Sequence, residues 1–426
     1  MYKGMTNSHD ARLFFTRQPI FGKNDLVWGH QLLSRDAPWL NEGNGTDHRS
    51  AIDGASPRLT KDPNLLARTY ACLPGQVGSR KILVGFSERS VLADEPRALS
   101  PLHTVIAVRE TASIRPDYLA ALDSLKKDRY AIAIDDFEGL VGAEALLRRA
   151  DIVKINVIGK TQTQILQLMK AASGNGEVLI AKGIENRKHL QLAQALGFTH
   201  FQGTFFRKPD IVPGRALTSN QIARLRLFKI IETGTPDFNR LAEAISMDAS
   251  ISYRLLVFLN SAAFSFPVEV TSISHAVVML GWEQVKTWLR MAILNDLAPS
   301  EKSAELVKLA AQRSNFFRLA AQRSQYTALP ADELFLLGLF SLLEPLLDMP
   351  VAEIVENLPI SPELKAGLRQ ETKIYRVWVE LAQRIEAADW SNVDRIIAFL
   401  GLDPACVTNS YYDANVLITA FFGAGD

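Results

Sequence analysis

The sequence predicts a protein of mixed class, in which an N-terminal (β/α)8 barrel of the TIM type precedes an all-helical domain. In the first half, short apolar runs alternate with amphipathic segments, as in parallel strands joined by right-handed helical crossovers. In the second half the strand pattern disappears, and apolar residues recur at helical spacing. A chain of 426 residues is also too long for one ordinary hydrophobic core.

The barrel prediction rests on the order of the strand-like runs. Residues 13–21 and 26–33 predict two strands joined by a turn at residues 22–25. Further apolar runs follow at residues 81–86, 104–108, 130–135, 151–156, 177–184 and 198–203. An opening hairpin followed by parallel strands favours a closed barrel over an open sheet, which is the alternative.

The boundary between the two halves is expected where the strand pattern ends and the helical pattern begins. Residues 207–217 contain two prolines and precede a long series of helical periods, as expected of a linker. We therefore expect the barrel at residues 1–210, the linker at 211–217 and the helical domain at 218–426.

Composition narrows the class of function. Apolar residues make up 47% of the chain, charged residues 22%, and the net charge is +1, which is typical of a globular protein and makes nucleic acid an unexpected partner. The two cysteines, Cys72 and Cys406, match no metal or redox spacing. Without a long apolar run or a signal-peptide pattern, we expect no membrane insertion and a cytoplasmic location.

In a TIM-type barrel the chemistry lies where the strands end, because the following loops converge there. The residues closing the predicted strands are Gln31, Gly85, Ala107, Glu110, Asp135, Asp136, Lys154, Lys182, Glu185 and Gln202.

Several of these positions fall in segments that resemble a known family. The segments AIDDFEG, VKIN, AKGIEN and FQGTFFRKP occur in this order, after the opening RQPIFGKNDLVWGHQLLSR. They resemble the DDFG, KID, AEGVE and QGY…KP segments of EAL phosphodiesterases and the opening of EAL–HDOD fusion proteins. The resemblance spans residues 14–209 and implies an enzyme that cleaves cyclic di-GMP with two Mg²⁺ or Mn²⁺ ions.

The resemblance also implies which ligands this chain lacks. The glutamate of the EAL motif falls on Gln31, a strand asparagine on Gly85, and a metal-binding glutamate on Ala107. The first glutamate of AEGVE falls on Lys182, which places a positive charge where cations bind. Hard divalent cations need several oxygen ligands, so we predict a degenerate barrel with no cofactor and no enzymatic activity.

Other family positions are retained. Glu110, Asp135, Asp136, Lys154, Glu185 and Gln202 match the family, and Asn156 replaces an aspartate. Three carboxylates close together repel one another. We therefore expect Lys154 and Lys182 to pair with Asp135, Asp136 and Glu185, and we do not expect cyclic di-GMP to bind. The alternative is that the retained residues serve packing and that Lys182 is a surface lysine.

The helical half resembles the HDOD domain over residues 228–289, including the run LNSAAF and the Ser272-Ile273-Ser274 turn. HD phosphohydrolases of related fold need several histidine and aspartate ligands, but this half contains only His275. The resemblance therefore implies a binding module. Possible contact residues are Asn260, Ser261, Phe264 and Trp282. We favour the alternative that Asn260 and Ser261 end a helix and that Phe264 and Trp282 pack in the core.

From the sequence, we predict a non-catalytic bacterial signal-transduction scaffold that binds signalling proteins through its HDOD domain. The alternatives are a cyclic di-GMP receptor that binds without hydrolysis, and a residual cyclic di-GMP phosphodiesterase.

Overall fold

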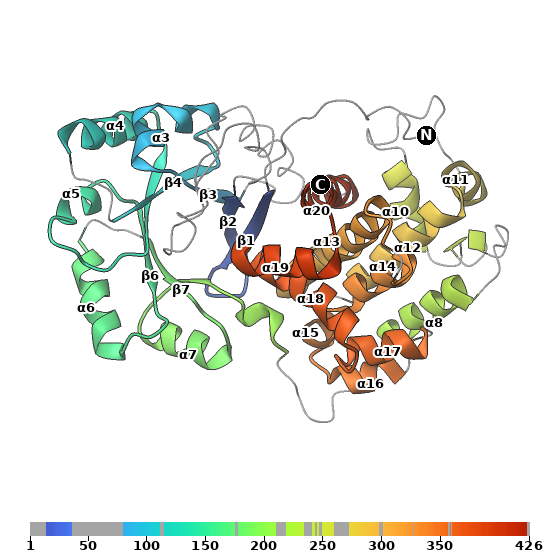
Figure 1. The fold of residues 1–426 in the computed structure, drawn as a ribbon. Helices are drawn as coiled ribbons and strands as arrows, with labels where there is room; N and C mark the ends of the chain where they lie inside the picture. Colours follow the sequence, from blue (N-terminus) through green and yellow to red (C-terminus); the bar gives the residue numbers. More distant parts are fainter. Residues whose placement is uncertain are drawn as a thin grey trace.

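The computed structural model describes residues 14–35, 80–110, 115–174, 178–209, 219–233, 241–242, 245–246, 249–259, 272–297, 301–326, 328–356, 358 and 360–423 (Figure 1). A barrel forms one side of the molecule and a group of helices forms the other. The predicted barrel followed by a helical region is confirmed.

The barrel is a closed ring in sequence order, β1 to β8. Its strands are β1 (Phe14–Phe21), β2 (Val27–Arg35), β3 (Lys81–Gly85), β4 (Thr104–Arg109), β5 (Ala131–Asp135), β6 (Ile152–Asn156), β7 (Val178–Lys182) and β8 (His200–Gln202). β1 is antiparallel to both neighbours, β2 and β8, and the remaining pairs are parallel. Closure leaves no exposed sheet edge, and it brings the first strand against the last.

The strands are mostly apolar because both faces of the sheet are buried. Ile20, Leu83, Val105, Ala133 and Ile180 belong to one buried cluster that fills the barrel. Alternate residues of the same strands join the larger cluster outside it, which is the expected result of the two-residue period of a strand.

Short helices cover the barrel. They are α3 (Glu88–Leu92), η3 (Glu95–Ala98), α4 (Pro116–Lys127), α5 (Glu144–Leu147), α6 (Gln162–Ala172), α7 (Arg187–Ala195) and η4 (Phe205–Arg207). Local sequence sets their starts: Pro116 opens α4, and Thr161 and Gln164 form a reciprocal capping box on α6.

The helical half contains α8 (Ser219–Thr233), α10 (Ala249–Leu259), α11 (Ile273–Leu280), α12 (Trp282–Asp296), α13 (Glu301–Arg323), α14 (Ala331–Phe340), α15 (Leu343–Leu347), α16 (Val351–Glu356), α17 (Pro362–Leu368), α18 (Lys373–Glu386), α19 (Trp390–Leu400) and α20 (Pro404–Gly423). The long helix α13 packs against α14 and α20. Gly338 allows the close approach of α14, because a Cβ there would lie 2.5 Å from the backbone nitrogen of Ser314.

Buried polar contacts join the two halves. Arg17 of β1 lies 3.2 Å from Glu305 of α13, and Tyr411 of α20 donates a hydrogen bond to Thr16 at 3.2 Å. The large hydrophobic cluster also includes residues of both halves. The predicted linker, 211–217, lies outside the described residues, and the predicted domain boundaries stay a prediction.

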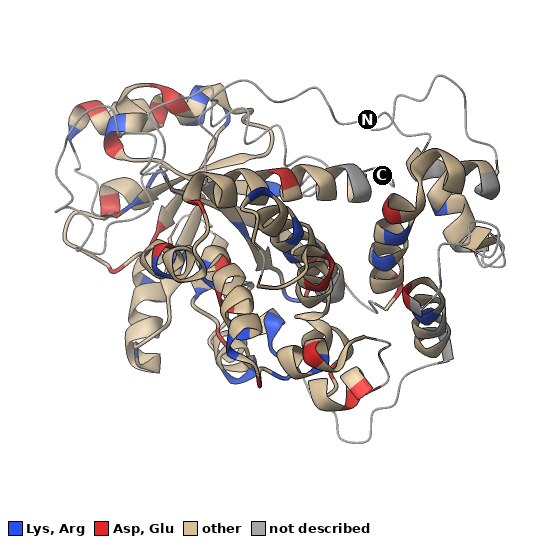
Figure 2. Cartoon of the chain, turned by 45° about the vertical axis from the view of Figure 1, so that its right-hand side comes forward, with Lys and Arg blue, Asp and Glu red and all other residues tan. Residues whose placement is uncertain are grey.

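Charge is distributed without a dominant sign. Figure 2 shows basic and acidic residues interspersed along the helices of both halves, in keeping with the net charge of +1. Among the described helices, none combines the length and apolar character that crossing a bilayer requires. The cytoplasmic location stays a prediction.

Candidate ligand site at the mouth of the barrel

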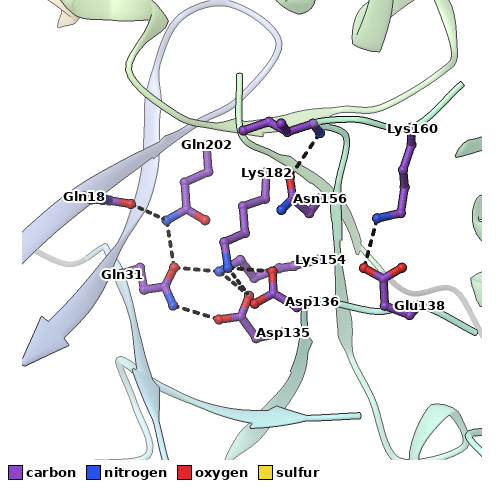
Figure 3. A network of polar contacts seen from close by, with 11 residues as sticks. Gln18, Gln31, Asp135, Asp136, Glu138, Lys154, Asn156, Lys160, Lys182 and Gln202 are labelled. Atoms are coloured by element: carbon purple, nitrogen blue, oxygen red, sulfur yellow. Dashed lines mark hydrogen bonds and ion pairs between the residues drawn. The ribbon is translucent and has the colours of Figure 1, made fainter. Parts of the chain in front are cut away.

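The barrel gathers polar side chains from strands that are far apart in the sequence. Strand register places Gln18 opposite Gln31 across the β1–β2 pair, and Lys182 beside Gln202 across the β7–β8 pair. Asp135 ends β5. We call the group formed by Gln18, Gln31, Asp135, Asp136, Lys154, Lys182 and Gln202 the mouth cluster (Figure 3).

Asp135 lies at the centre of the mouth cluster. Its Oδ1 is 2.9 Å from Lys154 Nζ, and its Oδ2 accepts a hydrogen bond from Gln31 Nε2 at 3.0 Å. Lys182 Nζ lies 3.3 Å from the same Oδ1 and 2.6 Å from Oδ1 of Asp136. Two carboxylates and two ammonium groups therefore compensate one another within a few ångströms (Figure 3).

Three glutamines extend this group toward β1. Gln31 Oε1 accepts hydrogen bonds from Lys154 Nζ at 2.6 Å and from Gln202 Nε2 at 2.7 Å. Gln202 Nε2 also donates to Gln18 Oε1 at 3.1 Å. Among the described residues, nothing donates a hydrogen bond to Gln202 Oε1, although Gln202 is only 1% exposed. The opposite amide orientation would place this oxygen against two other amide oxygens, so an acceptor at the mouth is left without a donor.

The surroundings favour the charged forms of Asp135 and Lys182. Burial alone would raise the pKa of Asp135, but the positive charges of Lys154 and Lys182 outweigh it and lower that pKa, assisted by hydrogen bonds from Lys154 and Gln31. Burial would lower the pKa of Lys182, but Asp135 and Asp136 raise it. Lys154 differs, because burial lowers its pKa more than the neighbouring Asp135 raises it.

Other predicted site residues lie apart from these contacts. Gly85 ends β3, where a Cβ would meet nothing within 4 Å, and Ala107 is buried in the barrel cluster. Glu185 follows β7 but is exposed and takes no part in the mouth cluster. Glu110 is buried and accepts hydrogen bonds from the backbone nitrogens of Glu138 and Leu140, so it holds the loop after β5.

Sequence reasoning missed Gln18. The residue lies within the strand-like run 13–21, but β1 runs antiparallel to the others, so the rule of inspecting strand ends does not select it. Its cross-strand register with Gln31 was the available signal, because directly opposed residues point to the same face.

The described residues do not fit a centre of two divalent cations. No three histidine, cysteine, aspartate or glutamate side chains among them are grouped so that they could hold a metal ion. Asp135 and Asp136 already pair with lysines, and Glu110 is occupied by backbone amides. Lysine ammonium groups compensate the negative charge of Asp135 and Asp136 in this arrangement.

Of the four possible contact residues in the helical half, Asn260, Ser261 and Phe264 lie outside the described residues. Trp282 begins α12 and is partly buried against the main hydrophobic cluster.

Comparison with known proteins identifies one domain of the chain. Residues 219–346 match the HDOD domain. The chain therefore contains an HDOD domain behind a barrel, and the HDOD domain predicted in the helical half is confirmed.

Two relatives match most of the chain. Cyclic di-GMP phosphodiesterase CdgJ of Vibrio cholerae is 28% identical over 392 residues, which are 92% of this chain and 88% of that protein. The uncharacterized protein YuxH of Bacillus subtilis is 28% identical over 395 residues, covering 90% and 93% of the two chains.

Solved structures match about half of the chain. A calcium and cyclic di-GMP complex of BlrP1 from Klebsiella pneumoniae has a TM-score of 0.35 and 22% identity, covering 47% of this chain and 56% of that one. An EAL domain protein from Listeria monocytogenes has a TM-score of 0.37 and 17% identity, covering 48% and 94%.

One prediction is contradicted by these findings. From Gln31, Gly85, Ala107 and Lys182 we predicted that the chain is not an enzyme. A relative that aligns with 92% of the chain is named as a cyclic di-GMP phosphodiesterase, and no comparison shows a loss of catalysis. The reason for the error is that the absence of ligands at individual positions was extended to the activity of the whole protein.

Proposed function

We propose that this protein transmits a signal by binding a partner protein through its HDOD domain. The observation that supports this most directly is the exposure of large apolar side chains on two helices that pack against each other, α10 and α11. Tyr253 of α10 is 70% exposed, and Val278 and Met279 of α11 are 68% and 41% exposed.

These side chains are suited to a protein interface. Single exposed apolar residues are common on protein surfaces, but aromatic residues and methionine are enriched where partners dock. All three residues lie within the segment 219–346 that matches the HDOD domain. Removing such side chains from water on binding a partner would supply a favourable hydrophobic contribution.

Affinity purification of the full chain from its source cells, with mass spectrometry of retained proteins, tests this function. A Tyr253→Asp/Val278→Asp variant should lose a protein that the unmodified chain retains. Leu166→Asp is the matched control, because Leu166 lies on barrel helix α6 and is 49% exposed. Retention of the same proteins by all three chains would reject the proposed surface.

A second function concerns the barrel, whose mouth we infer to bind cyclic di-GMP. The sequence-based expectation that this nucleotide does not bind is untested, and the relative named as its phosphodiesterase favours the opposite. Two features of the mouth cluster support binding. Gln202 Oε1 lacks a donor among the described residues, and a guanine base offers N–H donors. Lys182 is 27% exposed and offers a cation to a phosphate.

The ion pairs of the mouth make this function testable by mutation. Phosphate must compete with Asp136 for Lys182, so Asp136→Asn should tighten cyclic di-GMP binding and Lys182→Met should weaken it. Lys160→Met is the control, because Lys160 pairs with Glu138 at 2.9 Å outside the mouth cluster (Figure 3).

Calorimetric titration with and without Mg²⁺, followed by chromatography of the nucleotide, measures binding and hydrolysis together. Linear dinucleotide in the products would show phosphodiesterase activity, and unchanged nucleotide would show binding alone. An unmodified chain that binds no nucleotide would reject this second function.

A further inference from the structure

Gln18 connects the mouth cluster to the helical half. Its Oε1 accepts a hydrogen bond from Gln202 Nε2 at 3.1 Å, and its Nε2 donates to the backbone oxygen of Glu386 at 3.0 Å. Because the amide is planar, its oxygen and nitrogen keep a fixed relation to each other. A reorientation of the amide that follows a movement of Gln202 therefore changes the hydrogen bond to Glu386.

The acceptor on α18 is a helix-end carbonyl. Glu386 is the last residue of α18, where the final carbonyl groups have no partner in the next turn of the helix. A side chain of the barrel thus satisfies a carbonyl at the end of a helix in the helical half. The two residues are 368 positions apart in the sequence.

The carboxylate of Glu386 is buried and pairs with two arginines. It is 1% exposed, and Arg313 Nε and Nη2 donate to its two carboxylate oxygens at 2.6 and 2.8 Å. Arg207 Nη1 lies 2.8 Å from the same carboxylate. Arg207 belongs to η4, which directly follows the strand that carries Gln202. The end of α18 is therefore tied to β1 and to the segment after β8.

We propose that Gln18 is a positioning residue that couples the mouth cluster to the end of α18, so that a change at the mouth alters α18 and the reverse. A hydrogen-bonded path runs from Lys182 through Asp135, Gln31, Gln202 and Gln18 to Glu386. Through this path, a ligand bound at the mouth cluster would change the end of α18. Only this ligand-dependent part rests on the second proposed function; the coupling itself does not.

Hydrogen exchange of the full chain, read by mass spectrometry in peptides of α18, tests the coupling without a ligand. Lys182→Met disrupts the mouth, and the last turn of α18 should then exchange about tenfold faster. Asp136→Asn is a milder second variant and should change α18 in the same direction. In a Gln18→Leu background neither substitution should alter α18 further.

Lys160→Met is the control at the same end of the barrel. It breaks the pair of Lys160 with Glu138 and leaves the path to Gln18 intact, so the exchange of α18 should not change (Figure 3). The coupling is overturned if Lys182→Met and Asp136→Asn leave α18 unaffected, or if they affect it equally with and without Gln18. A merely structural contact would give one of those results.

The same exchange experiment with added cyclic di-GMP distinguishes failure of the coupling from failure of the second proposed function. Cyclic di-GMP should change the exchange of α18 in the unmodified chain and leave it unchanged in Gln18→Leu. If the nucleotide binds and α18 responds equally in both chains, the coupling through Gln18 is wrong. If the nucleotide does not bind, the second proposed function fails, and the mutational arm still decides the coupling.

Discussion

Lys182 Nζ lies 2.6 Å from Asp136 Oδ1, which ties the end of β7 to the turn after β5. Asp136 adopts a left-handed backbone conformation with a φ of 55°, so the turn points its carboxylate at the lysine while Asp135 faces the cluster from the strand. The ion pair therefore depends on a backbone conformation that most L residues rarely adopt.

Reversal of the charge at position 182 should destabilise the fold. Lys182→Glu places a third carboxylate beside Asp135 and Asp136 and leaves Lys154 as the remaining cation of the mouth cluster. Because these side chains are partly exposed, the free energy of unfolding should fall by about 1–3 kcal/mol, less than for a fully buried pair. Urea unfolding measures it, with Lys160→Glu as the control at a pair outside the cluster. Equal losses in the two variants would contradict the special role of Lys182.

Acid should weaken the fold through Asp135. The positive charges around this carboxyl hold its folded-state pKa below the value of about 3.9 for an unfolded aspartate, even though burial acts in the opposite direction. The unfolded state therefore binds more protons near pH 4, and stability falls as the pH drops from about 5. Urea midpoints measured between pH 6 and pH 3 should show a shallower pH dependence for Asp135→Asn. An unchanged slope would show that other groups control the acid response.

The buried carboxylate of α18 should matter far more than an exposed one on the same helix. Glu386→Gln leaves Arg313 and Arg207 buried without a counter-charge, at a cost of about 3–5 kcal/mol. Glu380→Gln is the matched control, because its pair with Arg384 is 41% and 42% exposed and contributes about 1 kcal/mol or less. Chemical unfolding of both variants gives the comparison, and similar losses would mean that the buried triad is not critical.

Gly203, directly after β8, and Gly85, at the end of β3, should differ in their tolerance of an added methyl group. A Cβ on Gly203 would overlap the backbone of Ile184, whereas a Cβ on Gly85 would meet nothing within 4 Å. Gly203→Ala should therefore cost about 1–3 kcal/mol, because the backbone must shift to relieve the overlap. Gly85→Ala should stay within about 0.5 kcal/mol. Thermal unfolding of the two variants distinguishes them. An unchanged melting temperature for Gly203→Ala would show that the segment after β8 shifts at little cost.

Much of the fold and part of the site follow from local patterns. Alternating apolar runs and amphipathic segments determine strands and helices, and the rule that loops converge where strands end selected Gln31, Asp135, Lys154, Lys182 and Gln202. Figure 3 shows these five side chains together. The rule works because parallel strands in one barrel end on the same side, whatever lies between them in the sequence.

The sequence by itself determined the order of elements, the division into a barrel half and a helical half, and the chemical types of residue at the strand ends. Only the tertiary structure decided which of those residues touch. It left Glu185 exposed, brought Gln18 into the cluster through the antiparallel first strand, and placed Glu386 between Arg207 and Arg313. Contacts between residues hundreds of positions apart depend on barrel closure and on the packing of helices against β1, and no local pattern encodes either.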